Sequence, residues 1–341
     1  MANYILIKRR LSAGGKGPLF KAGYKQMRVL GAVLFGLLFA TGGVAARDCT
    51  KAEASGADSR LIDIIRSSEA RTALEHRHAP FGLHESQDVA TREDVLHHGG
   101  YLTLYDGDLR APLWVSYSLA RDDISSAQGK PRVECFRTDP RLNDEYASLK
   151  SDYVEPVYDR GHMTSDADLK DNLLEQLNSY VMSNMVPQHC RFNRGVWLNL
   201  ENLTRSWAEE YGDIIVVSGA IYDRDLDGRR DPDQLAERMQ SNNGRARVAV
   251  ASAFYKVILR QDGQRWRSIA FMLPHNNDPH GTGWAAVSGY VKSKVVQLQD
   301  IESAAGTVLH PELNRAMLLQ SSQGEGWSFS GGGRNFEGGC K

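Results

Sequence analysis

The sequence predicts an α+β fold in which a central, mostly antiparallel sheet is flanked by helices. Residues 100–106 and 113–119 alternate apolar and polar side chains, as half-buried strands do, and an Asp-Gly-Asp turn at 106–108 separates them. Residues 213–222 form a nearly continuous apolar run, which is typical of a strand buried on both faces. From residue 196 to 211, apolar side chains recur at helical spacing and would bury one side of a helix.

Further elements follow from the same patterns. Residues 153–162 predict a strand, and residues 247–259 and 268–273 predict two more. Residues 287–298 indicate a strand or extended segment that leads into a helix, and residues 59–65 indicate a short amphipathic helix.

Composition places the chain among globular proteins. Of its 341 residues, 41% are hydrophobic and 24% are charged, and the formal net charge is −1. This balance argues against a protein that holds nucleic acid by bulk positive charge, because such binding scales with the number of phosphates neutralised. It leaves room for a local basic rim, for which the sequence offers five arginines: Arg132, Arg137, Arg160, Arg191 and Arg194.

The N-terminal segment has the composition of a targeting signal. Residues 1–47 contain no acidic residue, and a basic stretch precedes an apolar run that ends in small residues. We interpret residues 1–46 as a secretory signal, with an uncleaved membrane anchor or a mitochondrial presequence as alternatives. Residues 47–77 would then be a linker or N-terminal wrap, residues 78–315 one globular domain, and residues 316–341 a Gly/Ser-rich tail.

The cysteine count is even, at four. Cys49, Cys135, Cys190 and Cys340 are compatible with two disulfides in any of three connectivities. An exported chain is expected to form at least one bridge, and a bridge to Cys340 would hold the Gly-rich tail.

The residues with catalytic potential cluster in the middle of the chain. The run from Tyr158 to Met163 places His162 beside Arg160 and Gly161, and a neutral oxygen ligand, Asn193, follows downstream. A base, an amide oxygen, a carboxylate and several arginines suit the attack of water on a phosphodiester at a hydrated metal ion.

The spacing of two of these residues restricts how they could bind one ion. Asn193 and Glu201 are eight positions apart, which on a continuous helix is roughly 12 Å along the axis. Either one of them acts through a water molecule or Asn193 lies at the helix start, where the chain bends. Mg²⁺ suits both arrangements, because it keeps several waters and takes few protein ligands.

At this point the motifs resemble a known family, the DNA/RNA non-specific endonucleases, whose site is of the ββα-metal or His-Me finger type. The resemblance rests on Asp-Arg-Gly-His at 159–162, Ser-Asn-x-x-Pro-Gln at 183–188, Asn-Arg-Gly at 193–195 and Leu-Glu at 200–201. A single short motif would be weak, but four in the family's order are specific. The likeness extends over roughly residues 78–315 and implies an α+β domain with a ββα-metal active site.

The resemblance implies a role for each matching residue. His162 would be the general base and Asn193 the direct ligand of Mg²⁺, with Mn²⁺ as a substitute ion. Glu201 would hold a metal-bound water, Asn184 would help to position the site, and Arg160 would support the strand or the phosphate.

In this family, an arginine lies in the sequence shortly before an aromatic residue and an Asp-Pro pair, and it points at the scissile phosphate. Arg132 and Arg137 both fit this description, and the local spacing departs slightly from the family pattern. We favour Arg132.

Each of these residues also has a structural interpretation. His162 could be a hydrogen-bonded core histidine, Asn193 a helix cap, and Glu201 the partner of Arg205 one turn later. Asp166 and Asp168 are interpreted as turn residues rather than outer-shell groups. The joint occurrence of the motifs favours the active-site interpretation for the first three.

An acidic segment suggests a second cation site. Asp223, Asp225, Asp227 and Asp231 occupy positions 1, 3, 5 and 9 of a calcium-loop pattern that has Gly228 at position 6. Gln234 replaces the usual glutamate at position 12, so a solvated acidic turn is an equal alternative to a structural Ca²⁺ site.

The sequence therefore predicts an exported, secreted or periplasmic endonuclease that uses one Mg²⁺ ion per site on DNA and RNA. Membrane-anchored and mitochondrial locations are the alternatives, and we expect no stable membrane association once a signal is removed. A homodimer is compatible with the sequence. The competing functions are a catalytically silent nucleic-acid-binding protein and a Ca²⁺-binding extracellular protein on the same fold.

Overall fold

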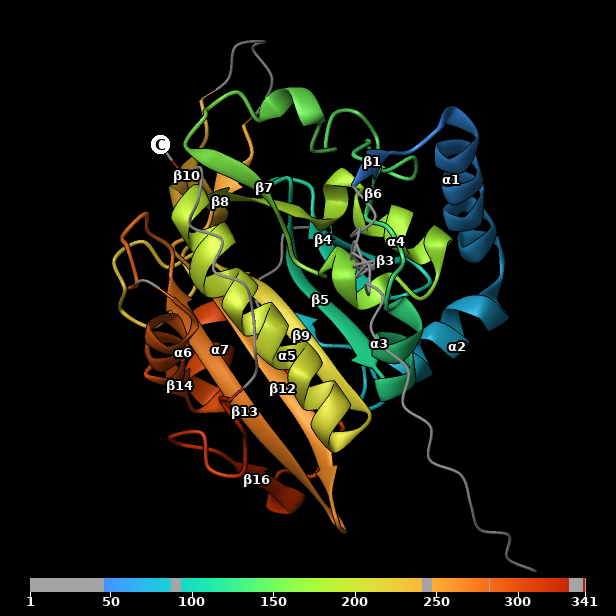
Figure 1. Ribbon diagram of the computed structural model, residues 1–341. Helices are drawn as coiled ribbons and strands as arrows, with labels where there is room; N and C mark the ends of the chain where they lie inside the picture. The colour runs from blue at the N-terminus through green and yellow to red at the C-terminus, as the bar shows by residue number, and fades with distance from the viewer. Residues whose placement is uncertain (1–45, 87–92, 241–246, 282, 331–339, 341) are drawn as a thin grey trace, which may run out of the picture. The chain divides into compact units, whose positions relative to one another are not determined.

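The computed structural model describes residues 46–86, 93–240, 247–281, 283–330 and 340 (Figure 1). The predicted leader, except for its last residue, lies outside these ranges. Among the described residues, no helix combines the length and the apolar character needed to cross a lipid bilayer.

The strands centre on one large sheet, in the order β14-β13-β12-β9-β5-β4-β3, with β16 beside β13. All neighbouring pairs in this sheet are antiparallel except β13 and β16, which confirms the predicted α+β class with a mostly antiparallel sheet. The strands are β1 (Arg47–Asp48), β2 (Glu85–Ser86), β3 (Glu93–His97), β4 (Leu102–Asp106), β5 (Ala111–Leu119), β6 (Val133–Glu134), β7 (Tyr158–His162), β8 (Met185–His189), β9 (Ile214–Ile221), β10 (Glu237–Arg238), β11 (Ala249–Val250), β12 (Ala253–Asp262), β13 (Arg265–Pro274), β14 (Val295–Val296), β15 (Thr307–Val308) and β16 (Leu318–Gln320).

Helices cover both faces of this sheet, and a π-helical turn over Phe192–Trp197 runs directly into the longest helix of the second half, α5. The helices are α1 (Lys51–Arg66), α2 (Ser68–His78), α3 (Arg121–Ala127), α4 (Leu173–Ser179), α5 (Leu198–Tyr211), α6 (Trp284–Lys292) and α7 (Leu298–Ala305), with short 3₁₀ turns at Lys150–Asp152, Asp166–Leu169, Met182–Asn184, Asp233–Leu235 and Arg315–Met317.

The predicted central strands are confirmed. Residues 100–106, 113–119 and 213–222 correspond to β4, β5 and β9, and every residue of β9 is buried. Burial on both faces explains its unbroken apolar run. On one face α5 crosses β9 and β12 (Figure 1), and Trp207 of α5 stacks on Phe271 of β13. On the other face α7 packs against β9 and β13.

The prediction for residues 287–298 is wrong in its first part. Residues 284–292 form α6, in which Val287 and Val291 are buried one turn apart, and only Val295 and Val296 are extended. Short apolar runs do not distinguish a strand from a buried helix by periodicity alone. Packing of α6 against α5, with Asn199 hydrogen-bonded to Ser288 over 3.2 Å, selects the helix here. The predicted following helix is α7.

The segment interpreted as a linker or wrap is helical. The predicted short helix at 59–65 is part of α1, which begins at a capping box between Thr50 and Glu53. Ahead of α1, the two residues of β1 pair in parallel with β6. The N-terminal segment is therefore fastened to the domain by a ladder as well as by helix packing.

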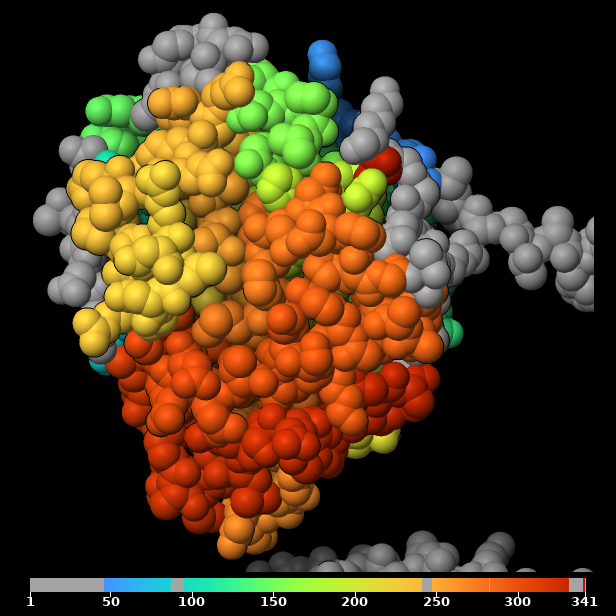
Figure 2. All heavy atoms as spheres, turned by 90° about the vertical axis from the view of Figure 1, so that its left-hand side faces the viewer, coloured from blue at the N-terminus to red at the C-terminus, as the bar shows by residue number. Residues whose placement is uncertain are grey.

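The two disulfides join Cys49 to Cys135 and Cys190 to Cys340. At least one bridge was expected, and the second of the two reaches the Gly-rich tail through Cys340. The observed pairing is one of the three connectivities that the sequence left open. In the described part of the tail, Trp327 is buried edge-on against Trp207. Figure 2 shows that the second half of the chain, coloured yellow to red, forms most of the face that lies on the left-hand side of Figure 1.

A buried histidine pair makes stability sensitive to acid. His84 and His310 lie edge to face with ring centres 4.8 Å apart, and burial lowers the pKa of His84 to about 3. The unfolded chain would protonate His84 near pH 6.5. Below that pH the unfolded state binds more protons than the native state, so the free energy of unfolding falls as pH decreases.

We expect His84→Phe to make the free energy of unfolding less dependent on pH, because phenylalanine keeps the ring but does not titrate. The slope between pH 7 and pH 5, measured by urea denaturation, should decrease by up to about 1.4 kcal/mol per pH unit. The control is His76→Phe, at an exposed position of α2, which should leave the slope as it is. An unchanged slope in His84→Phe would show that His84 is not the source of this acid sensitivity.

Candidate active site

Two short strands and a helix build the site. β7 carries His162 and pairs antiparallel with β8, and the chain then passes into the π-helical turn and α5. This is the strand, strand, helix order that the sequence predicted. Gly161 lets the strands meet, because a Cβ at that position would lie 2.2 Å from Oε1 of the Gln188 side chain. Gly161 is not among the glycines with a positive φ, so close approach of the two strands is the reason for glycine at this position.

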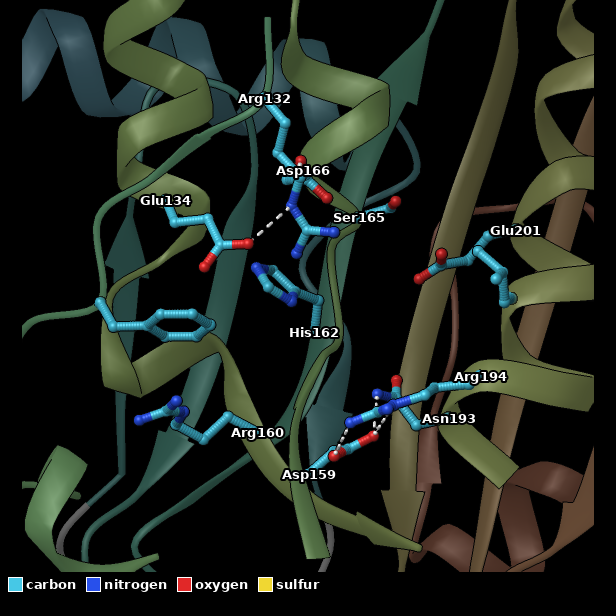
Figure 3. A pocket seen from close by; sticks show the side chains of 12 residues that line it. Arg132, Glu134, Asp159, Arg160, His162, Ser165, Asp166, Asn193, Arg194 and Glu201 are labelled. Carbon is cyan, nitrogen blue, oxygen red and sulfur yellow. Dashed lines mark hydrogen bonds and ion pairs between the residues drawn. The ribbon is translucent and has the colours of Figure 1, made fainter. Parts of the chain in front are cut away.

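A pocket of about 550 Å³ opens over these elements (Figure 3). The predicted residues His162, Arg160, Arg132, Asn193 and Glu201 all line it. Figure 3 shows His162, Arg160, Glu134 and Arg132 on one side of the pocket and Asn193, Arg194 and Glu201 on the other, with Asp159 of β7 beside Asn193 and Arg194. The full lining consists of Arg132, Glu134, Phe136, Asp159, Arg160, His162, Ser165, Asp166, Asn193, Arg194, Leu198 and Glu201.

His162 is held with a neutral ring. Its backbone carbonyl accepts a hydrogen bond from Trp197 Nε1 over 3.0 Å, and its ring meets Tyr180 edge to face at 4.7 Å. Burial lowers its pKa to about 4, although the Asp166 carboxylate acts in the opposite direction. The Nε2 atom is buried and has no hydrogen-bond partner within the described part of the chain. Because the ring is neutral, it can accept a proton at neutral pH.

Asn193 is oriented by a carboxylate. Its amide nitrogen donates to Asp159 Oδ2 over 3.0 Å, and Arg194 donates to both oxygens of the same carboxylate over 2.8 Å. Because the nitrogen is engaged, the amide oxygen is the atom left to bind a ligand. Asn193 is not a helix cap, since it lies inside the π-helical turn, and such turns recur at functional sites.

The π-helical turn also resolves the spacing between the two ligand candidates. Asn193 lies in this turn and Glu201 in the first turn of α5, and both line the same pocket despite their separation of eight positions. Asn193 is therefore at the bend before the regular helix, which was one of the two arrangements that the spacing allowed.

Glu201 is buried at the inner end of the pocket. Burial raises its pKa, while the cations Arg205 and Lys256 favour its charged form. The alternative interpretation of Glu201 as the ion-pair partner of Arg205 is not what the structure shows, because Arg205 donates instead to Asp168 over 2.6 Å. Lys256 is fully buried, with its ammonium 2.6 Å from the Ser218 hydroxyl.

Arg132 is the arginine that reaches the pocket. Its Nε donates to the Tyr180 hydroxyl over 2.8 Å and lies 3.4 Å from Glu134 and 3.6 Å from Asp166. Arg137 points elsewhere, into an ion pair with Asp58 at 2.6 Å. The choice of Arg132 over Arg137 as a pocket residue agrees with this geometry.

Arg160 lies over the ring of Phe136, with the guanidinium carbon 4.4 Å from the ring centre. A cation in this position is attracted by the electron-rich face of the ring and is held at the pocket edge. Of the other arginines in the predicted basic rim, Arg194 lines the pocket, whereas Arg191 is engaged with Asn277.

Asn184 does not line the pocket. It is fully buried and holds the chain after β7, accepting from the Thr164 backbone N–H over 2.9 Å and donating to the Thr164 carbonyl over 3.0 Å and to the Ser179 carbonyl over 2.7 Å. Asn184 therefore fixes Thr164, which lies two residues after His162 in the chain, and does not itself face the pocket. The expected positioning role fits this geometry.

Several pocket residues were not selected from the sequence. Asp166 was interpreted as a turn residue, yet it lines the pocket and faces Arg132. No motif in the sequence marked Glu134, Phe136 or Ser165 as a site residue. The one available indication was that residues 132, 134 and 136 alternate along a short extended segment and so share a face. The interpretation of Asp168 as a simple turn residue is also incomplete, since it is buried between Arg205 and Tyr117.

The acidic loop after β9 brings only part of the predicted calcium set together. Asp223, Asp225 and Asp227 each place a carboxylate oxygen within 4.8 Å of the others. Asp231 is used differently, because its carboxylate accepts from the Arg224 backbone N–H over 2.7 Å. The calcium site stays a prediction.

Comparison with known proteins gives a consistent family. Residues 83–316 match the family model described as DNA/RNA non-specific endonuclease. The chain is 29% identical over 220 residues to Nuclease EXOG, mitochondrial, from Danio rerio, covering 63% of this chain and 60% of that relative. It is 28% identical over 253 residues to Nuclease C1 from Cunninghamella echinulata var. echinulata, covering 72% of this chain and 95% of that relative.

Two further matches agree. Endonuclease G, mitochondrial, from Homo sapiens is 26% identical over 238 residues, which cover 69% of this chain and 73% of that relative. A crystal structure of an EndoG/EndoGI complex superposes with a TM-score of 0.57 and 23% identity over 71% of this chain and 93% of that chain. The structural match supports the α+β fold independently of the motifs.

Proposed function

Because the chain belongs to the DNA/RNA non-specific endonuclease family, we propose that it hydrolyses phosphodiester bonds within DNA and RNA without sequence preference and that it depends on Mg²⁺. The observation that carries the proposal is the pocket itself. It combines a neutral histidine, two cationic side chains beside that histidine, and an oriented amide oxygen with a carboxylate on the opposite side.

In the proposed reaction, the imidazole of His162 accepts a proton from water while the water oxygen forms a bond to phosphorus. The bond from phosphorus to the leaving sugar oxygen breaks, and that oxygen takes up a proton. A positioned base of this kind contributes about 10²–10⁴-fold to the rate. The neutral state of His162 at pH 7, caused mainly by burial, keeps it ready to act as the base.

Charge develops on the phosphate oxygens as the new bond forms. Arg132 and Arg160 line the pocket beside His162 and would stabilise that charge. Fixed cations in a partly enclosed site stabilise such charge without having to reorganise during the reaction. Glu134 and Asp166, which face Arg132, keep it oriented before substrate binds.

The donor set fits Mg²⁺, which prefers oxygen ligands and keeps most of its waters. Asn193 would hold the ion directly through its amide oxygen, and Glu201 would hold it through a water; Mn²⁺ would substitute. When bound, the ion would act as a Lewis acid at the phosphate. We propose one ion per site, since a two-metal site would need more carboxylates free to bind than this pocket offers.

The test is cleavage of supercoiled plasmid DNA and of single-stranded RNA by purified protein lacking residues 1–46. We expect both substrates to be cut in the presence of Mg²⁺ and neither in the presence of EDTA, with activity restored by excess Mg²⁺. A folded protein that binds DNA with Mg²⁺ present but does not cut it would favour the silent nucleic-acid-binding alternative. Loss of thermal stability in EDTA that only Ca²⁺ restores would favour the calcium-binding alternative.

Asp159→Asn should weaken binding of the metal. The substitution keeps the shape but removes the charge that pairs with Arg194, so the hydrogen bond that orients Asn193 is no longer fixed. Loss of such an outer contact lowers metal affinity by about 10–100-fold. Titration calorimetry with Mn²⁺ measures the change.

The matched variant is Arg194→Ala, which leaves the bond between Asp159 and Asn193 in place and should lower Mn²⁺ affinity less. Equal affinity in Asp159→Asn and the parent protein would exclude Asn193 as a ligand that this carboxylate orients.

We propose an oxidising compartment for the mature protein, either outside the cell or in the periplasm. The two disulfides support this, because such bonds persist mainly where thiols are not kept reduced. The names of two relatives, Nuclease EXOG and Endonuclease G, include the word mitochondrial, and a mitochondrial location is the alternative. Fractionation of cells with an antibody against the chain distinguishes the two locations. Sedimentation of the purified protein tests whether it forms a homodimer.

A further inference from the structure

One wall of the pocket is a short extended segment, residues 132–136. Its residues alternate, as in a strand. Arg132, Glu134 and Phe136 line the pocket, while Val133 and Cys135 are buried on the opposite side. The position of three pocket side chains therefore depends on what holds the back of this wall.

The back of the wall is held by the N-terminal segment. The Arg47 N–H donates to the Arg132 carbonyl over 3.0 Å, and the Cys49 N–H donates to the Glu134 carbonyl over 2.8 Å. Among the described strands, β6 pairs with β1 alone. The ladder that fixes this part of the wall thus comes from residues outside the match to the family model, which begins at residue 83.

Two more links join the same segments. A disulfide joins Cys49 to Cys135, between the pocket residues Glu134 and Phe136. Asp58 of α1 accepts from Arg137 Nε over 2.6 Å, immediately after the wall ends. Residues 47–58, which we name the brace, therefore contact the wall by backbone, covalent bond and ion pair.

The brace also reaches the catalytic histidine through a small core. Ala57 of α1 packs in one cluster with Val133, Cys135 and Tyr180. Tyr180 in turn accepts a hydrogen bond from Arg132 and meets the ring of His162 edge to face. A displacement of the brace would therefore change the positions of Arg132 and His162.

We propose that the brace is a positioning element of the active site, holding the wall of Arg132, Glu134 and Phe136 in the conformation that binds a nucleic-acid phosphate. This inference rests on the proposed function for its ligand, but the structural part stands apart from it. Without the brace, the wall populates other conformations. Apparent affinity falls in proportion to the fraction of molecules whose wall is in place, so KM rises while kcat changes little.

The test uses the full domain with both cysteines of one bridge replaced. In Cys49→Ala with Cys135→Ala, amide hydrogen exchange at residues 132–137 should become at least tenfold faster, while exchange in β9 stays as in the parent. For DNA cleavage, KM should rise about tenfold, as it does when the competent fraction falls to a tenth, and kcat should stay within about twofold.

The matched control is Cys190→Ala with Cys340→Ala. Those cysteines are 150 residues apart and the first pair 86, so chain entropy predicts at least as large a general loss of stability. This control should leave exchange at residues 132–137 unchanged. A second variant, Asp58→Ala, removes the ion pair with Arg137 and tests the brace with both bridges intact. Its control is Asp262→Ala, which removes a similar ion pair with Arg267 on the β12–β13 hairpin.

The outcomes separate the proposals. Uniformly faster exchange across the domain, or unchanged KM in both brace variants, would reduce the brace to a general stabiliser and overturn the inference. A parent protein that cuts neither DNA nor RNA would overturn the proposed function and the kinetic part of the inference together. Hydrogen exchange would still decide whether the brace holds the wall.

Discussion

Replacing His162 with alanine is expected to lower the rate of DNA and RNA cleavage by about 10²–10⁴-fold without unfolding the protein. This corresponds to about 3–5 kcal/mol of activation free energy. The physical reason is that His162 brings a neutral ring to the pocket beside Arg132 and Arg160. Removing the ring leaves the cations in place but removes the group that takes the proton from water. Plasmid nicking at saturating Mg²⁺ measures the effect.

Two measurements decide whether this loss is chemical or structural. The variant should bind an oligonucleotide with nearly the affinity of the parent, because Arg132 and Arg160 still line the pocket. Added imidazole should restore part of the rate by supplying a base in the space that the side chain leaves. Cleavage by His162→Ala at the parental rate would mean that the active site lies elsewhere, and loss of both binding and near-ultraviolet circular dichroism would indicate unfolding.

Gly161→Ala is the second change with a large expected effect. The added Cβ would lie 2.2, 2.4 and 2.6 Å from three side-chain atoms of Gln188, which is itself fully buried. Overpacking of this kind lowers the free energy of unfolding by about 1–3 kcal/mol. Because β7 must shift, His162 moves with it, and a displacement of about 1 Å can cost about 10²-fold in rate. Urea denaturation and kcat/KM measure the two effects.

The matched control is Gly195→Ala, in the Asn-Arg-Gly motif of the same site. A Cβ at Gly195 has no atom within 4 Å, and the residue lies in the π-helical turn. This variant should keep its activity and be as stable as the parent or slightly more stable, since alanine favours helical backbone over glycine. If Gly161→Ala matched Gly195→Ala in stability and rate, close approach of the two strands would not be the reason for glycine at position 161.

The family and the main site residues could be predicted from the sequence because their signals are local. Strands β4, β5 and β9 and helix α5 each follow from periodicity within one segment, and the motifs containing His162, Asn193 and Glu201 lie within about 45 residues. Local patterns fail where the same run suits two structures. Residues 284–292 became a helix because α5 offers a face to pack against, which no pattern inside that run records.

What only the tertiary structure decided are the contacts between distant segments. Arg132 rather than Arg137 reaches the pocket because Asp58, 79 residues earlier, takes the guanidinium of Arg137. Asp166 faces the pocket because Arg132 lies opposite, and Asn193 is oriented because β7 brings Asp159 to the π-helical turn. The sequence by itself determined which residues could do the chemistry, since residue type and short spacing carry that information. Folding decided which of them meet, because burial and pairing are set by surfaces that come together only in three dimensions.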